Sequence, residues 1–230
     1  MPTALVTGAS RGIGRAIAHR LAADGYGIVA VARSGDELDT LAAEIGEMGG
    51  RCHTIELDVT DPAAVQASLG EVDADVLVNN AGVGVMKPLL ELEPEDWRRM
   101  LDVNVNALYH VTRAVLPGMV ERGRGHVVTI GSLAGRNTFA GGTCYTGTKH
   151  FVMGFSESLM LEVRDRGVKV SVVMPGSVAT HFGRGRGPGP DDDWKLQAED
   201  VAEAVAHLLD TPPNVLISRV EMRPAAPRKA

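Results

Sequence analysis

The sequence predicts an α/β fold: a doubly wound parallel sheet with helices on both faces. Two observations predict it. Short, almost purely apolar runs alternate with longer amphipathic stretches along the chain, as is typical of parallel strands that are buried on both faces and joined by crossover helices. A length of 230 residues with 44% hydrophobic side chains allows one substantial core, so we expect a single domain over residues 1–223.

The first strand and helix show the pattern most clearly. An apolar run at 4–6 leads into a glycine-rich turn, and Ile13, Ile17 and Leu21 then recur at every fourth residue. This spacing places their side chains on one face of a helix, and Gly25 is a typical helix stop. The segment is therefore predicted to open a βαβ unit.

The same reasoning assigns the remaining elements. Amphipathic patterns predict helices over 38–48, 62–69, 95–121, 145–165 and 198–209. Apolar, β-branched runs predict strands at 28–31, 53–57, 76–78, 126–130, 168–173 and 215–217. Helices and strands thus alternate as a doubly wound sheet requires.

A glycine- and proline-rich run at 183–190, followed by three aspartates and Trp194, interrupts this alternation. Its composition excludes a packed helix or strand. Because it follows a strand end at the ligand-binding edge of such a sheet, we predict a mobile lid over about 181–194. A loose surface connection is the alternative. The tail at 224–230 is predicted to be disordered.

The bulk composition argues against several partners. A net charge of −6 and a pI near 5.6 provide no basic surface for nucleic acid or an anionic membrane. No apolar run approaches the ~20 residues of a membrane span, and the glycine-rich turn begins at Thr7, too early for a preceding signal peptide. A cytoplasmic location is therefore expected. Cys52, Cys144 and the histidines follow no metal-ligand spacing, so no metal site is predicted.

Tyr145 and Lys149 form the most informative pair in the chain. Four residues apart on a helix, their side chains share one face, where an ammonium group can favour the ionised form of a phenol. Bringing a phenol pKa from ~10 to ~7 requires roughly 4 kcal/mol, and a unit charge at ~5 Å supplies about 3 kcal/mol only at an effective dielectric constant of ~20. We therefore expect a partly dry cleft with Tyr145 as a general acid and base. The alternative is an exposed pair on a helix surface.

The turn from Gly8 to Gly14 joins a strand to a helix. Its glycines let the backbone bend sharply and approach a pyrophosphate held at the positive helix N-terminus. The turn is therefore predicted as a nucleotide site, with an ordinary tight turn as the alternative.

Six motifs follow one another along the chain. They are Thr7-Gly8-x-x-x-Gly12-x-Gly14, Asn79-Asn80-Ala81-Gly82, Asn104, Ser132, Tyr145-x-x-x-Lys149 and Pro175-Gly176. Together they resemble the short-chain dehydrogenase/reductase family, and the resemblance spans nearly the whole chain. It implies a single-domain Rossmann fold and a nicotinamide-dependent oxidoreductase.

The resemblance implies a catalytic set. Tyr145 would exchange a proton with the substrate oxygen as hydride moves to or from the cofactor, and Ser132 would hydrogen-bond the same oxygen. Lys149 would bind the nicotinamide ribose and tune the phenol, and Asn104 would orient a water that relays protons. Without the resemblance, Ser132 is interpreted as a turn former, and Asn104 could equally be a polar residue inside a helix.

The resemblance also implies the cofactor contacts. Asp58 and Val59 would contact the adenine, Asn80 the adenosine ribose, and Val178 and Thr180 the nicotinamide carboxamide. Asp58 could equally be a cap before the next helix. The full set of cofactor-binding residues is Gly8, Ser10, Arg11, Gly12, Ile13, Gly14, Arg33, Asp58, Val59, Asn80, Ala81, Gly82, Tyr145, Lys149, Pro175, Gly176, Val178 and Thr180.

The end of the second predicted strand argues for NADP (NADPH) over NAD. An NAD enzyme needs a carboxylate there for the ribose 2′-hydroxyl, and an NADP enzyme needs a cation instead. Ala32 stands where family members that use NAD tend to carry Asp, Arg33 follows it, and Arg11 is a second well-placed cation. A guanidinium binds phosphate in a forked geometry. Asp36 is the rival ribose contact, but it lies several residues past the strand end.

These inferences predict an NADP(H)-dependent oxidoreductase that transfers hydride between the nicotinamide and a ketone or secondary alcohol, such as a 3-oxoacyl or 3-hydroxy acid compound. The alternative is a catalytically silent redox sensor of the same fold, which would have no reason to retain Ser132, Tyr145 and Lys149 together. The family's usual assembly implies a homodimer or homotetramer built through the two long helices.

The substrate is less well specified by the sequence. Arg136 either faces a substrate carboxylate or serves the loop structure. An apolar substrate pocket is expected from Val85, Met86, Leu133, Phe139, Phe182 and Trp194.

Overall fold

The computed structural model describes residues 1–183, 189 and 192–226. Within these residues, seven parallel strands form one sheet in the order β3-β2-β1-β4-β5-β6-β7. They are β1 (Thr3–Thr7), β2 (Gly27–Ala32), β3 (Arg51–Glu56), β4 (Val76–Asn79), β5 (Gly125–Ile130), β6 (Val168–Pro175) and β7 (Arg219–Met222). The predicted doubly wound parallel sheet is confirmed.

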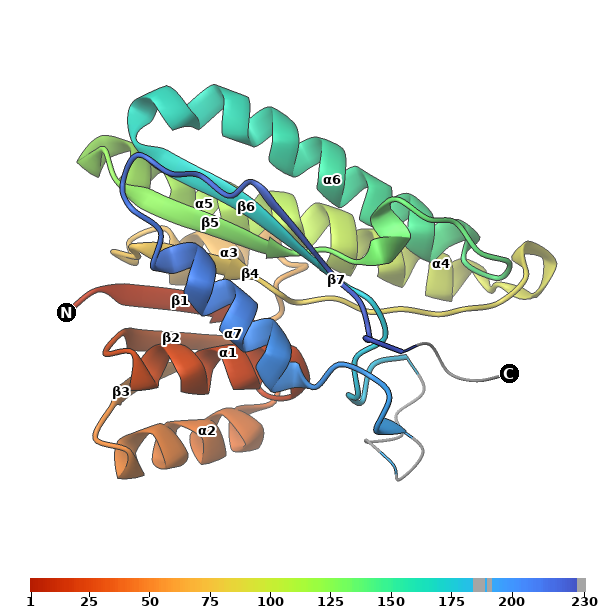
Figure 1. Cartoon of the computed structure of the whole chain (residues 1–230), viewed down its shortest axis with the longest axis horizontal. Helices are drawn as coiled ribbons and strands as arrows, with labels where there is room; N and C mark the ends of the chain where they lie inside the picture. Colours follow the sequence, from red (N-terminus) through yellow and green to blue (C-terminus); the bar gives the residue numbers. More distant parts are fainter. Residues whose placement is uncertain (184–188, 190–191, 227–230) are drawn as a thin grey trace.

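Helices cover both faces of this sheet (Figure 1). One face is covered by α1 (Gly12–Ala23), α2 (Gly35–Glu47) and α7 (Ala198–Leu209). The other face is covered by α3 (Pro62–Leu69), α5 (Ala107–Arg122) and α6 (Thr143–Val163). α4 (Pro94–Leu101) leads into α5, and short 3₁₀ turns occur at Leu89–Glu91, Leu133–Gly135 and Arg164–Arg166.

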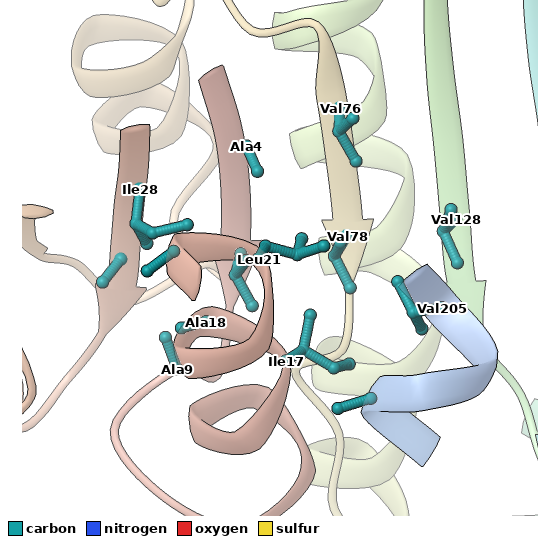
Figure 2. Close-up of a cluster of buried hydrophobic side chains, with 14 of the residues drawn as sticks. Ala4, Ala9, Ile17, Ala18, Leu21, Ile28, Val76, Val78, Val128 and Val205 are labelled. Carbon is teal, nitrogen blue, oxygen red and sulfur yellow. The ribbon is translucent and has the colours of Figure 1, made fainter. Parts of the chain in front are cut away.

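Alternate residues of the central strands enter two hydrophobic cores. On β1, Ala4 and Val6 face one core and Leu5 faces the other. Figure 2 shows the first core, where Ile17 of α1 and Val205 of α7 pack against the strands. Burial on both faces explains why the strand sequences are continuously apolar rather than alternating.

The strand order reverses beside β1. After β1 the chain builds β2 and β3 on one side, and it then returns to place β4 on the other side. The loops that follow β1 and β4 therefore diverge, and they open a crevice at the carboxyl ends of the strands, where such sheets bind ligands.

The predicted last strand at 215–217 is wrong. The edge strand begins at Arg219, two residues past the end of the predicted strand, and pairs in parallel with the end of β6. Residues 215–217 approach β6 differently, because the Ser171 hydroxyl donates to Ile217 O at 2.7 Å. An edge strand has one side open to water, so β7 alternates exposed charged residues with half-buried apolar ones, a weaker signal than the apolar run before it.

The predicted helix at 95–121 contains a wider turn. Between α4 and α5, a single π-helical turn spans Asp102–Asn106. A π turn inserts one extra residue into the helical repeat and is frequent at functional sites. It carries the buried side chain of Asn104.

The predicted lid and tail lie partly outside the described residues. Residues 184–188 and 190–191 of the predicted lid, and 227–230 of the predicted tail, are not among them. Both assignments therefore stay predictions. In the part of the chain that the structure describes, no helix is long and apolar enough to cross a membrane.

Candidate active site

A cleft of about 650 Å³ lies at the carboxyl ends of the strands, where the strand order reverses. Most of the predicted site residues line it together: Gly8, Ser10, Arg11, Gly12, Ile13, Arg33, Asp58, Val59, Asn80, Ala81, Gly82, Ser132, Tyr145, Lys149, Pro175, Gly176, Val178 and Thr180. Gly14 and Asn104 are buried and do not line it. The roles of all these residues stay predictions.

The turn after β1 has a backbone shape that fits a pyrophosphate. Gly8 and Gly12 have φ of 65° and 57°, in the left-handed region that favours glycine. A Cβ on Gly14 would lie 2.3 Å from Gly8 O, so any side chain there would push the turn apart. α1 begins at Gly12, and among the described residues the N-cap residue, Arg11, makes no side-chain capping hydrogen bond. Its first amide groups can therefore bind an anion.

Asn80 holds this turn against the end of β4. Its Nδ2 donates to Thr7 O at 2.9 Å and to Gly8 O at 3.2 Å. In return, Thr7 Oγ1 accepts from the backbone amides of Asn80 and Ala81 at 3.0 and 3.1 Å. The Asn80 amide group thus fixes two walls of the cleft to each other.

Arg11 and Arg33 are exposed cations in the cleft lining. The ion pairs found among the described residues involve neither of them. Two guanidinium groups without an ion-paired carboxylate suit a phosphate ligand. Asp36, the rival ribose contact, does not line the cleft.

Asp58 has a structural role as well as a place in the cleft. Its Oδ1 accepts from the Thr60 backbone amide at 3.0 Å and from Thr60 Oγ1 at 2.7 Å. The backbone hydrogen bond is the main reason why the pKa of Asp58 is lowered, and the charge of Arg33 also contributes. Asp61 rather than Asp58 caps α3, by accepting from Ala63 N and Ala64 N. Asp58 therefore caps a turn just before the helix.

Tyr145, Lys149 and Ser132 meet in the cleft. Tyr145 and Lys149 share one face of α6, and each is 7% exposed. Lys149 Nζ lies 5.9 Å from the centroid of the phenol ring and donates to Ile130 O at 3.1 Å. The Ser132 hydroxyl is hydrogen-bonded to Tyr145 and accepts from Ala134 N at 3.1 Å.

The electrostatics of this pair differ from the expectation. Burial raises the pKa of Tyr145 above its ordinary value, and the hydrogen bond with Ser132 opposes this only in part. Burial also lowers the pKa of Lys149 to about 8. The expectation that Lys149 brings the phenol pKa towards neutrality is therefore wrong for this structure, because desolvation disfavours the charged form of each group.

Asn104 lies in the π turn, and its side chain is buried. Its Oδ1 accepts from Val83 N at 2.9 Å, and its Nδ2 donates to Val83 O at 2.8 Å and to Thr148 Oγ1 at 3.0 Å. These bonds tie the loop after β4 to α6. A second cavity of about 20 Å³ is lined by Asn104, Lys149 and Thr7 among others, which is room for one water molecule with polar partners.

The predicted apolar pocket is correct only in part. Within the described residues, Val85 and Phe182 line the cleft, whereas Met86, Leu133, Phe139 and Trp194 do not. Leu133 instead packs in a small core with Met153 and Met174. Arg136 forms an ion pair with Glu221 of β7, so the structural interpretation of this arginine is the one observed.

Several lining residues were missed by sequence reasoning. Most of them adjoin a predicted motif or a strand end, and extending each motif by one or two positions would have found them. Arg99 adjoins no predicted motif or strand end, because its position in the cleft lining depends on how α4 lies over the cleft. The missed residues are Val31, Ser34, Glu37, Leu57, Val83, Gly84, Arg99, Val103, Ile130 and Gly131. Among the described residues, no group of three or more His, Cys, Asp or Glu side chains could hold a metal ion.

The class of protein follows from what shares the cleft. The glycine-rich turn and the buried side chains of Tyr145 and Lys149 line one cavity, an arrangement typical of oxidoreductases built on a Rossmann sheet. The chain belongs to the short-chain dehydrogenase family, whose family model, described as "short chain dehydrogenase", matches residues 2–190.

Individual relatives and solved structures agree with this assignment. The NADP-dependent 3-hydroxy acid dehydrogenase YdfG of Salmonella typhi is 40% identical over an alignment of 235 positions. The alignment covers 96% of this chain and 94% of the relative. An alcohol dehydrogenase from the archaeon Thermococcus sibiricus, complexed with 5-hydroxy-NADP, superposes with a TM-score of 0.93 at 34% identity, covering 100% of this chain and 99% of the other. The closed form of serine dehydrogenase complexed with NADP+ gives a TM-score of 0.88 at 37% identity, covering 96% and 94%.

Proposed function

We propose that this protein is an NADP(H)-dependent oxidoreductase that reduces a ketone or oxidises the corresponding secondary alcohol, with 3-oxo and 3-hydroxy acids as the substrate class. One observation carries the proposal. Ser132, Tyr145 and Lys149 line the same cleft as the glycine-rich turn. A nucleotide held at that turn and a carbonyl group at the phenol would therefore share one cavity.

The cofactor is assigned from the residues and from the relatives. YdfG is described as NADP-dependent, and both solved structures hold a form of NADP. In this chain the amides of the Gly8–Gly14 turn would bind the pyrophosphate, and Arg11 and Arg33 would bind the 2′-phosphate. When bound, the nicotinamide supplies or accepts the hydride.

Tyr145 acts as the proton donor in the reduction. Its phenolic proton goes to the substrate oxygen while the carbonyl carbon receives the hydride, so the ketone gains two electrons and two hydrogens and becomes an alcohol. The raised pKa of Tyr145 keeps the phenol protonated at neutral pH, which suits this direction. Alcohol oxidation needs the phenolate and is favoured at higher pH. Ser132 donates a hydrogen bond to the same oxygen and positions it.

Lys149 and Asn104 support this proton transfer. With one Nζ hydrogen engaged by Ile130 O, Lys149 keeps two donors for ribose hydroxyls. Its pKa of about 8 leaves it largely protonated at pH 7, so its charge would offset part of the desolvation cost of the phenolate that remains after proton transfer. A water in the polar cavity beside Asn104 and Lys149 would return the proton from bulk solvent.

Two relatives point to the substrate class. YdfG is named for 3-hydroxy acids. The serine dehydrogenase is named for serine, which is itself a 3-hydroxy acid. In the described lining, the carboxylates Glu37 and Asp58 come from the segments after β2 and β3. They belong to the half of the cleft that would hold the adenosine, so they would not repel an acid substrate at Tyr145.

The proposal extends to the assembly of the protein. A homodimer or homotetramer would form through the long helices α5 and α6. Tyr109 of α5, with Phe151 and Leu161 of α6, presents exposed apolar surface for such contacts.

The experiment that tests the proposal is NADPH consumption across a panel of 3-oxo acids, 3-oxo esters and aldehydes, repeated with NADH. We expect the fastest consumption with 3-oxo compounds, and a kcat/KM for NADPH at least about ten-fold above that for NADH, since each charge-assisted phosphate contact contributes roughly 1.5–3 kcal/mol. Comparable rates with both nucleotides would contradict the cofactor assignment. If no carbonyl compound led to NADPH consumption, the proposed oxidoreductase function would be contradicted.

A further inference from the structure

Phe182 lies over the phenol of Tyr145. The two ring centroids are 5.8 Å apart, with an angle of 56° between the ring planes. Phe182 lines the cleft, and 45% of it is exposed. Aromatic rings at this separation are in contact, so a substrate whose carbonyl oxygen reaches the phenol must also meet the phenyl ring.

Gly84 provides the seat for this ring. A Cβ placed on Gly84 would lie 2.6 Å from Phe182 Cε1 and 2.8 Å from Cζ, closer than real side chains approach. Gly84 is not one of the glycines with positive φ. The constraint at Gly84 is therefore one of space, since its backbone shape is open to alanine as well.

The other end of the same segment also lies close to a glycine. A Cβ on Gly12 would lie 3.5 Å from Thr180 Cβ and Cγ2, and Phe182 N donates to Thr180 Oγ1 at 3.3 Å. Residues 180–182 thus bridge the cleft from the glycine-rich turn to the loop after β4. Phe182 therefore lies beside Gly84 and Tyr145, and the segment that carries it begins beside Gly12.

We propose that Phe182, seated on Gly84, is the residue that limits the size of the group next to the substrate carbonyl. The inference rests on the proposed reductase function and adds a specificity-determining residue to it. A methyl or similarly small group fits beside the phenyl ring, whereas a phenyl or branched group collides with it. The protein therefore discriminates among 3-oxo compounds by the bulk of the substituent at C3.

The test compares ethyl 3-oxobutanoate with ethyl 3-oxo-3-phenylpropanoate as substrates, with NADPH. The wild type should favour the methyl ketone. Phe182→Ala should raise kcat/KM for the phenyl ketone relative to the methyl ketone by about ten-fold or more, because shape exclusion by one side chain reaches this size. Phe182→Leu should give a smaller change in the same direction.

Phe139→Ala is the matched control. Phe139 is the same residue type with nearly the same exposure, 46%, and it does not line the cleft. Its substitution should leave the ratio of the two kcat/KM values unchanged within about two-fold, which is the level of ordinary surface substitutions.

Gly84→Ala tests the seat separately. The added methyl group should displace the exposed phenyl ring and raise the same ratio without any change to Phe182. Because the effect acts through that ring, Gly84→Ala should add nothing further in a Phe182→Ala background, and this loss of additivity identifies the contact.

The outcomes separate the inference from the function on which it rests. If the wild type oxidises NADPH with neither ketone nor any other carbonyl compound, the proposed function fails. If the wild type is active but reduces both ketones equally well, or Phe182→Ala leaves the ratio unchanged, the function stands and the inference about Phe182 is overturned. A Gly84→Ala effect that persists in full without Phe182 would also overturn it.

Discussion

At the scale of single residues, burial controls the chemistry of Tyr145 and Lys149. Each side chain is nearly inaccessible to water, and desolvation disfavours the phenolate and the ammonium alike. The sequence predicts their shared helix face from the spacing of four residues. The sequence does not predict the direction in which the pKa of Tyr145 shifts, because that shift depends on how tightly the surrounding loops close over the ring.

The proposed preference for NADPH is assigned to two individual side chains in the cleft lining, Arg11 and Arg33. Arg33→Ala should lower kcat/KM for NADPH by roughly 10–100-fold, because a charge-assisted hydrogen bond to phosphate contributes about 1.5–3 kcal/mol. It should leave kcat/KM for NADH within about two-fold of the wild-type value. Steady-state kinetics with both nucleotides measure this.

Arg98→Ala is the control for the arginine experiment. Arg98 is an exposed arginine of α4 that pairs with Glu95 and does not line the cleft. It should change neither constant. Equal losses with NADPH and NADH in Arg33→Ala would contradict a contact with the 2′-phosphate, and would point to a general effect on the cleft.

At the scale of elements, most of the fold could be predicted from the sequence. The central strands are buried on both faces, so each produces a continuous apolar run that marks its position. The edge strand β7 lacks this signal because one side of it is open. The sequence therefore predicts the last strand at the more apolar run of residues 215–217. The π turn at Asp102–Asn106 has no periodic signal, because one inserted residue barely disturbs the pattern of a long helix.

A buried polar chain connects β5, β6 and the approach to β7. His126 Nε2 lies 2.8 Å from Ser171 Oγ, and Ser171 Oγ donates to Ile217 O. A hydroxyl has one hydrogen to donate, so the imidazole must donate to Ser171. Burial, with a smaller effect from the charge of Lys169, lowers the pKa of His126 to about 4.

This histidine should make stability depend on pH. Above pH ~6.5 the imidazole is neutral in both the folded and the unfolded chain. As the pH falls from ~6.5 to about 4, the unfolded chain takes up a proton that the folded chain refuses, so the free energy of unfolding falls by roughly 3 kcal/mol and then levels off.

Urea unfolding of the wild type and His126→Gln at several pH values measures this contribution. Glutamine keeps a donor for Ser171 but does not titrate. The stability difference between the two proteins should therefore shrink by up to about 3 kcal/mol between pH 7 and pH 4. A difference that is constant with pH would show that His126 does not titrate in this way.

At the scale of the whole molecule, the sheet topology assembles the site. The reversal of strand order beside β1 brings the turn after β1 and the segments after β2, β3, β4, β5 and β6 to one cleft. The order of the motifs along the chain predicts this convergence. The seating of Phe182 on Gly84 and the position of Arg99 could not be predicted, because they depend on how loops and α4 settle over the sheet after it forms.

Turnover is what distinguishes an enzyme from a nucleotide-binding sensor of the same fold. The most direct measurement is NADPH oxidation by the wild type and by Tyr145→Phe with a 3-oxo acid, together with NADPH binding to both proteins. We predict that Tyr145→Phe lowers kcat by about 10²–10⁴-fold, the usual contribution of a positioned general acid, and leaves the dissociation constant for NADPH within about two-fold. A Tyr145→Phe protein that reduces the substrate at the wild-type rate, or a wild-type protein that binds NADPH but turns over no carbonyl compound, would contradict the account.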